Sequence, residues 1–292
     1  MGQKLSVGGQ AVIEGVMMRG PGKIAVAVRK PNGEITVDLK PAGSISDRHP
    51  ILKKPFLRGV VSLVESLIYG MKALSFSAQA SGEEEEEQMS SLELAGTIAF
   101  SVGLAIALFV VLPTGAMKLL QGAGVSPVVL NLCEGLLRLG IFLLYIWGIS
   151  RQKDIQRVFQ YHGAEHKTIY TYEHGLPLRV ENVRPFSTLH PRCGTNFLMI
   201  VMLISIFIFT FLGWPSLWER ILSRILLMPV VAGISYEIIR FAGRHMDKPW
   251  VRTAILPGLA LQKLTTRQPD DDQIEVAIAS LKAVLPPEEI IE

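Results

Sequence analysis

Four long hydrophobic segments constrain this chain more than any other feature of its sequence. They cover residues 92–112, 128–149, 197–213 and 221–239. Each is near the roughly 20 apolar residues that an α-helix needs to cross a bilayer, and the third is the shortest. Buried core helices of a soluble protein are the alternative, but only 19% of the residues are charged, below the about 25% of soluble domains. We therefore predict a mainly α-helical, polytopic membrane protein with about four transmembrane helices.

Lysine and arginine residues between these segments predict the orientation of the chain. They are frequent before the first segment, between the second and third, and after the fourth, whereas the connection after the first carries only Lys118. Cytoplasmic loops carry the excess of these residues. The sequence thus predicts a multi-pass protein of the cell membrane whose two termini and whose residues 151–196 are cytoplasmic. The net charge of +3 is too small to suggest a nucleic-acid partner.

The N-terminal residues 1–48 predict a small cytoplasmic β-containing region. Apolar and polar residues alternate over 23–29 and 34–39. Asn32-Gly33 between them is a strong turn signal, so we expect a β-hairpin. The glycines of residues 8–21 fit no phosphate-binding loop, and we expect one strand between tight turns there. Glu14 and Arg19 in this stretch are weaker candidates for a functional site.

The remaining segments are arranged around two transmembrane hairpins. Residues 49–81 carry a broad apolar face behind basic residues, which is typical of an amphipathic helix in the membrane interface. Residues 250–264 are apolar but contain Pro257, and 273–285 have helical apolar spacing. We predict an interfacial helix (49–81), an acidic linker (82–91), transmembrane hairpins (92–150 and 197–240) around a His-rich loop (151–196), and a helical C-terminal region (241–292).

The second hydrophobic segment contains two ionisable residues, Glu134 and Arg138, four positions apart. Ionisable groups in lipid are costly and usually turn inward as pairs. We expect an internal ion pair. A transport pathway is the weaker interpretation, because two residues and no evident internal repeat do not make a transporter.

The polar connection 151–196 concentrates the metal-ligand chemistry of the chain. His162 and His166 are four residues apart, so a helix would place both imidazoles on one face. With Glu165 they form His-x-x-Glu-His, the arrangement in which two His hold Zn²⁺ and the Glu is the general base. The alternative is a helix whose His residues only cap or hydrogen-bond. Candidates for a further ligand are His190, Cys193, Glu173, His174, Glu237 and His245.

Three motifs together resemble one known family. They are residues 8–19 (GGQAVIEGVMMR), 161–167 (YHGAEHK) and 190–197 (HPRCGTNF). The chain is similar in these motifs, and over nearly its whole length, to the bacterial YqhQ-like membrane proteins, a family of unknown function described as predicted metal-dependent enzymes. The resemblance implies a polytopic membrane protein and a metal site of His162, His166, His190 and Cys193 with Glu165. It implies no substrate.

Two functions from different classes fit these observations. The first is a membrane-embedded hydrolase that acts on a lipid or other membrane-associated substrate. It would use a divalent metal, and the His and Cys candidates favour zinc. Arg192, Lys167 and Arg19 could then neutralise a phosphate. The second is a non-catalytic scaffold or biogenesis factor whose cytoplasmic regions bind a partner such as the protein-insertion machinery or a ribosome. Structural zinc fills four positions with protein ligands and catalytic zinc leaves one open, so the ligand count separates the two.

Overall fold

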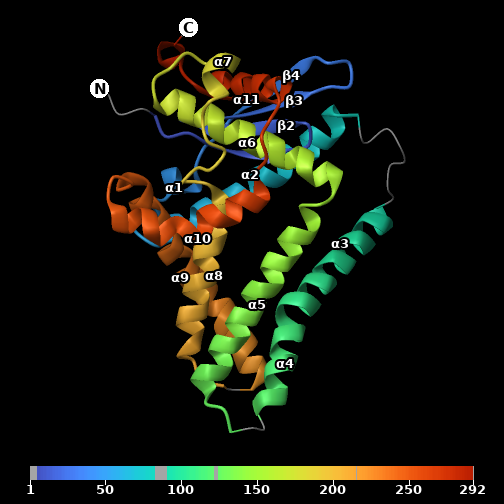
Figure 1. Cartoon of the computed structure of the whole chain (residues 1–292), viewed down its shortest axis with the longest axis vertical. Coiled ribbons are helices and arrows are strands. Elements are labelled where there is room, and N and C mark those ends of the chain that lie inside the picture. Colours follow the sequence, from blue (N-terminus) through green and yellow to red (C-terminus); the bar gives the residue numbers. More distant parts are fainter. Residues whose placement is uncertain (1–4, 83–90, 122–123, 215, 292) are drawn as a thin grey trace.

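A narrow helical bundle and a wider domain built on a four-stranded sheet make up the computed structural model of the protein (Figure 1). The structure describes residues 5–82, 91–121, 124–214 and 216–291. The predicted acidic run 83–87 therefore lies outside the described residues. The predicted fold class, mainly α-helical with a small N-terminal β region, is confirmed.

The bundle consists of the hydrophobic helices. The first hydrophobic segment forms α3 (Ser91–Ile106) and a π-helical turn (η2, Ala107–Val111). The helix then continues as α4 (Leu112–Gln121) beyond the predicted end at residue 112, so Lys118 lies in the helix and not in the connection. The second forms α5 (Pro127–Ile149), the third α8 (Gly194–Thr210) and the fourth α9 (Leu217–Arg244). Figure 1 shows that α4 and α8 end, and α5 and α9 begin, at the end of the bundle farthest from the sheet.

Among the described residues, four helices are long and apolar enough to cross a membrane, and three of them overlap predicted segments. They are α2 (Leu57–Ala80), Ala99–Gln121, α5 and Trp218–Arg244. Helix α8 is a shorter apolar helix of 17 residues, about 26 Å long at 1.5 Å per residue. The third predicted segment is helical only as far as Thr210. Helix α2 lies within the predicted interfacial helix 49–81, and its length and composition are sufficient to cross a membrane. Helix α2 also packs against the sheet and α9.

The sheet has the order β1-β2-β3-β4, with every pair antiparallel. The predicted hairpin is confirmed as β3 (Lys23–Arg29) and β4 (Ile35–Pro41), with Arg29 opposite Ile35. The prediction of a single strand in 8–21 was wrong, because β1 (Gly8–Val12) and β2 (Gly15–Gly20) form a second hairpin. Glu14 has φ +48° in its two-residue turn, a conformation that non-glycine residues seldom adopt. The local sequence therefore gave no turn signal there.

Helices cover both faces of the sheet. Along β3, Ala25 and Ala27 face α6 (Lys153–Glu173) and α11 (Asp271–Val284), while Val26 and Val28 face α2. This alternation follows from the two-residue period of a strand. The predicted amphipathic C-terminal helix is confirmed as α11, with Ile274 and Leu281 in the core. Segments from the N-terminus, the His-rich connection and the C-terminus thus share one core.

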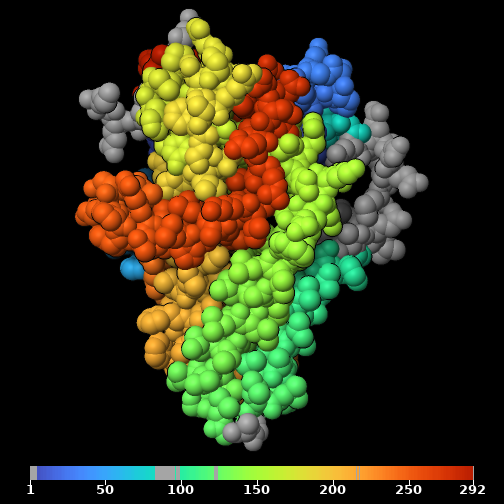
Figure 2. Space-filling view, in the orientation of Figure 1, coloured from blue at the N-terminus to red at the C-terminus, as the bar shows by residue number. Residues whose placement is uncertain are grey.

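Helix α10 (Pro249–Thr265) crosses the junction between the domain and the bundle, as Figure 2 shows in orange. Pro257 lies inside α10 without ending it. The short elements are α1 (Ile45–Arg48), η1 (Pro50–Lys53), α7 (Val180–Val183) and η3 (Pro287–Glu289). Both ends of the described chain lie at the sheet end of the molecule (Figure 1).

Candidate metal centre

Helix α6 places His162 and His166 on one face, as their spacing predicts. Their ring centroids are 4.4 Å apart. Gly163, between them, is required by a close approach: a Cβ there would lie 2.1 Å from the carbonyl oxygen of Arg267. The glycine that weakens this helix intrinsically therefore lets the α10–α11 connection pack directly on it.

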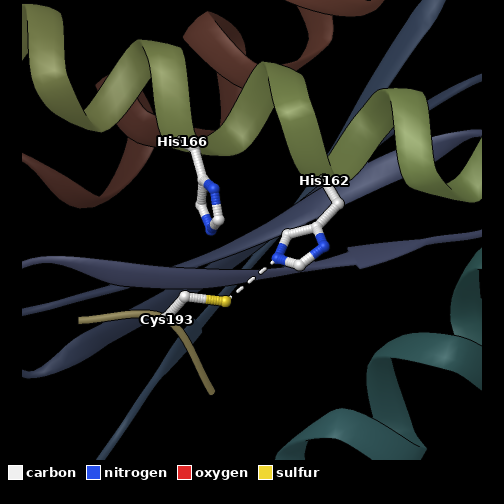
Figure 3. A group of neighbouring side chains, drawn as sticks. All are labelled: His162, His166 and Cys193. Carbon is white, nitrogen blue, oxygen red and sulfur yellow. Dashed lines mark hydrogen bonds between the residues drawn. The ribbon is translucent and has the colours of Figure 1, made fainter. Parts of the chain in front are cut away.

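Cys193 comes from another part of the chain and completes a group of three potential ligands. Its sulfur lies 3.2 Å from Nε2 of His162. The potential ligand atoms of His162, His166 and Cys193 all lie within 4.8 Å of one another. Figure 3 shows both imidazoles pointing from α6 toward the Cys193 side chain. Cys193 and His166 are buried and His162 is half-buried, so the group is shielded from solvent.

Backbone carbonyls orient both imidazoles. Nδ1 of His162 lies 2.8 Å from the carbonyl oxygen of Thr265, and Nδ1 of His166 lies 2.5 Å from that of Thr188. A carbonyl oxygen only accepts, so each Nδ1 must carry the proton and each Nε2 a lone pair. Metal-binding His residues are typically held in this way by their second nitrogen.

The remaining nitrogen of His166 is unused. Its Nε2 is buried and has no hydrogen-bond partner among the described residues. Burial lowers the pKa of the His166 imidazole, and the nearby Cys193 partly opposes this effect. A buried, neutral nitrogen with a free lone pair beside a second imidazole and a thiol could donate to a metal ion.

Buried amides hold the segment that carries Cys193. The Gln262 side chain accepts from the backbone N–H of His190 and donates to its carbonyl oxygen, both at 2.8 Å. Asn196 donates to the carbonyl oxygen of Pro191 at 2.7 Å. Cys193 itself is the N-cap of α8, and its sulfur accepts from the N–H of Thr195. Hydrogen bonds from both α8 and α10 therefore hold residues 190–193, here called the ligand loop.

His190 lies next to this group but outside it. Its ring centroid is 5.6 Å from that of His166, and its Nε2 is 3.5 Å from a carboxylate oxygen of Glu173. Burial lowers the pKa of His190 to about 4, although the Glu165 charge acts in the opposite direction. His190 is thus a neutral neighbour of the three candidate ligands.

Glu165 turns toward the sheet. The Gly9 N–H of β1 hydrogen-bonds its carboxylate, and a Cβ at Gly9 would lie 2.9 Å from its Cγ. Burial raises the pKa of this carboxyl, and electrostatic interaction with the imidazoles of His162 and His190 acts in the opposite direction. A carboxyl with a raised pKa can exchange a proton nearer to neutral pH than an ordinary one.

The other predicted site residues do not converge on this group, because each has a different partner elsewhere. Glu14 pairs with Arg157 and Tyr161, Arg19 with Glu65, and Glu237 with Arg58. His174 and His245 each bond a carbonyl oxygen of their own helix. Lys167 is buried, with its ammonium on the carbonyl oxygen of Arg184.

Glu173 and Arg192 form an ion pair beside His190. Both line a cavity of about 300 Å³ together with Tyr170, Pro191 and Met246. The ring of Tyr170 lies 4.6 Å from that of His190. The cavity therefore has polar and apolar walls and lies beside His190, the neighbour of the three candidate ligands.

Sequence reasoning missed Thr188, Thr265 and Gln262. The first two act through their backbone carbonyls, which leave no trace in residue type. Gln262 is fully buried. A polar residue within an apolar stretch of sequence was the signal that could have identified it.

Comparison with known proteins places this architecture in a family. A family model described as "Protein of unknown function (DUF1385)" matches residues 54–287. The chain belongs to the DUF1385 family. It is also 36% identical over 293 residues to "Uncharacterized protein YqhQ" of Bacillus subtilis (strain 168), which covers 95% of this chain and 92% of that protein. The resemblance to YqhQ-like proteins is thereby confirmed. No solved structure matches the chain.

Proposed function

We propose that this DUF1385 member is a metal-dependent hydrolase of the cell membrane. His162, His166 and Cys193 would hold one divalent ion of the zinc type, because two imidazoles and a thiolate are a donor set that zinc accepts. The observation that carries the proposal is the convergence of these three ligand atoms within 4.8 Å. Such an ion would supply Lewis-acid chemistry for hydrolysis.

Three convergent ligands favour a catalytic centre over a structural one, because structural zinc is usually enclosed by four. The backbone carbonyls of Thr188 and Thr265 would keep both imidazoles in the ligating tautomer. Glu165 would serve as the general base, consistent with the raised pKa of its carboxyl.

The position of the site suggests a membrane-associated substrate. Its ligand loop is bonded to α10, the helix that crosses the junction of domain and bundle. The neighbouring cavity offers Arg192 to a polar group and Met246 to an apolar one. Lipid headgroups and other amphiphiles combine both characters. The segments rich in lysine and arginine lie at the same end of the molecule as the site (Figure 1). Because such segments are usually cytoplasmic, both termini and the site would face the cytoplasm.

The metal content of the purified protein tests the proposal. We expect about one zinc-type ion per chain in the wild type and none in His162→Ala/His166→Ala, because two of three ligands are lost. His174→Ala is the matched control, since His174 is exposed at the end of the same helix. A wild type that binds no ion under chelator-free conditions would remove the hydrolase proposal.

A non-catalytic scaffold is the second candidate. It is favoured by one observation: Nε2 of His190 is also buried without a hydrogen-bond partner among the described residues. If His190 moves to complete a four-ligand structural site, His190→Ala should lose the metal. If the site has three protein ligands, His190→Ala should retain it. Loss of metal would direct attention to partners of the cytoplasmic domain.

A further inference from the structure

Three arginines surround a single carboxylate inside the helical bundle. Glu134 is 1% exposed. One of its oxygens accepts from Arg138 at 2.6 Å and from Arg224 at 2.7 Å. Its other oxygen accepts from Arg224 at 3.0 Å and from Arg220. Sequence analysis predicted only the Glu134–Arg138 pair, which is confirmed.

These residues lie at a common depth, far from the candidate metal centre. Glu134 and Arg224 are each the eighth residue of their helices, α5 and α9, about 10 Å from the helix start at 1.5 Å per residue. Both helices start at the end of the bundle farthest from the sheet (Figure 1). Arg138 also donates from Nε to the carbonyl oxygen of Phe109 at 2.8 Å, in the π-helical turn η2.

The charges of this cluster do not balance. Three guanidinium groups face one carboxylate, which leaves two positive charges among the residues just named. Glu219, the nearest acidic residue along α9, is bonded instead to Ser216 in the helix cap. Uncompensated charge between apolar helices is costly, and ionisable residues there usually mark a functional site.

Arg220 has unused bonding capacity. Its side chain is 7% exposed, and its Nε has no hydrogen-bond partner in the part of the chain that the structure describes. Its guanidinium carbon lies 3.7 Å from the ring centroid of Trp214, so one face is covered by an aromatic ring. The side chains of Arg138 and Arg224 are 20% and 17% exposed. The cluster therefore reaches the surface of the bundle at these two residues.

We propose that Arg138, Arg220 and Arg224 bind a phosphate group. Arginine presents a planar fork of N–H donors that matches phosphate oxygens, and a phosphate carries one to two negative charges, which would balance the excess. The phosphate belongs either to a lipid headgroup or to a soluble ligand that enters from the adjacent end of the bundle. This site is independent of the metal centre.

Thermal unfolding of the full-length protein in an uncharged, phosphate-free detergent tests the proposal. The probes are inorganic phosphate at constant ionic strength, dihexanoyl phosphatidylglycerol, and dihexanoylglycerol as the phosphate-free lipid. We expect a saturable rise of the unfolding midpoint with a phosphate-bearing probe and none with dihexanoylglycerol. A response to inorganic phosphate indicates a soluble ligand, and a response to the phospholipid alone indicates a headgroup.

Arg224→Gln and Arg138→Gln should each weaken the apparent affinity about tenfold, because each removes a charge-assisted contact. Arg240→Gln, on the same helix α9 but at its other end, should leave the affinity unchanged. Since Arg138 and Arg224 belong to different helices, one variant remains informative if the other fails to fold. The absence of a saturable response to both phosphate probes in the wild type, or an unchanged response in the folded arginine variants, overturns the proposal.

Discussion

Gly163 of α6 packs directly against Arg267 of the α10–α11 connection. No side-chain carbon fits between them, because a Cβ at Gly163 would lie 2.1 Å from the Arg267 carbonyl oxygen. The N–H of Arg267 donates to the carbonyl oxygen of Phe159 at 2.9 Å. This close packing brings the Thr265 carbonyl to His162. A single glycine thus permits the contact that orients His162, one of the three candidate ligands.

Gly163→Ala should destabilise the protein by about 2 kcal/mol, because the methyl group forces the connection away from α6. Thermal or denaturant unfolding measures the change. Gly140→Ala is the control, since a Cβ at Gly140 of α5 contacts nothing within 4 Å and alanine favours the helix. Equal stability of the two variants would show that the connection is not held this closely in solution.

Gln262→Ala should loosen the ligand loop. The change removes both hydrogen bonds to the backbone of His190 and costs about 2 kcal/mol in stability. If the metal site exists, its affinity should also fall by roughly 10- to 100-fold, as for other residues that support ligands. Competition with a chelator measures that affinity. Lys263→Ala, at an exposed neighbouring position, should behave like the wild type.

Glu165→Gln should change the pH dependence of stability and, if the metal site exists, retain the ion. Burial raises the pKa of Glu165 in the folded state, so the wild type loses stability as pH rises from the unfolded pKa of about 4.5 through the folded value. The variant has no such charge. The stability difference between variant and wild type should therefore grow in favour of the variant across this window.

Chemical unfolding of both proteins at several pH values measures this difference. Metal content measured on the same samples separates a proton-transfer role of Glu165 from a ligand role. Loss of the ion in Glu165→Gln would contradict the assignment of Glu165 as a base.

Glu134→Gln should destabilise the helical bundle more than any of the single arginine variants. It leaves three guanidinium groups without a counter-charge, and breaking a buried ion pair costs about 3 kcal/mol or more. Each arginine variant leaves Glu134 with two partners. Unfolding in detergent compares these proteins, with the exposed Glu219→Gln as control. A smaller loss in Glu134→Gln than in Arg224→Gln would contradict the charge count.

Local periodicity determined much of the fold from the sequence. The apolar segments predicted the bundle helices α3–α4, α5, α8 and α9, because burial of a helix in lipid requires a continuous apolar surface. Asn32-Gly33 predicted the β3–β4 hairpin, since these residues tolerate positive φ. The four-residue spacing of His162 and His166 predicted that their rings lie together, because 3.6 residues complete one helical turn.

Only the tertiary structure decided which distant residues meet. Cys193 reaches His162 across 31 positions, whereas His190 beside it faces Glu173. Arg220 and Arg224 reach Glu134 across 86 and 90 positions. Glu14 adopts a turn conformation that its residue type does not favour, held by its pair with Arg157. Such contacts depend on how whole helices and strands pack against one another, and the periodicity within each segment carries no information about its partner.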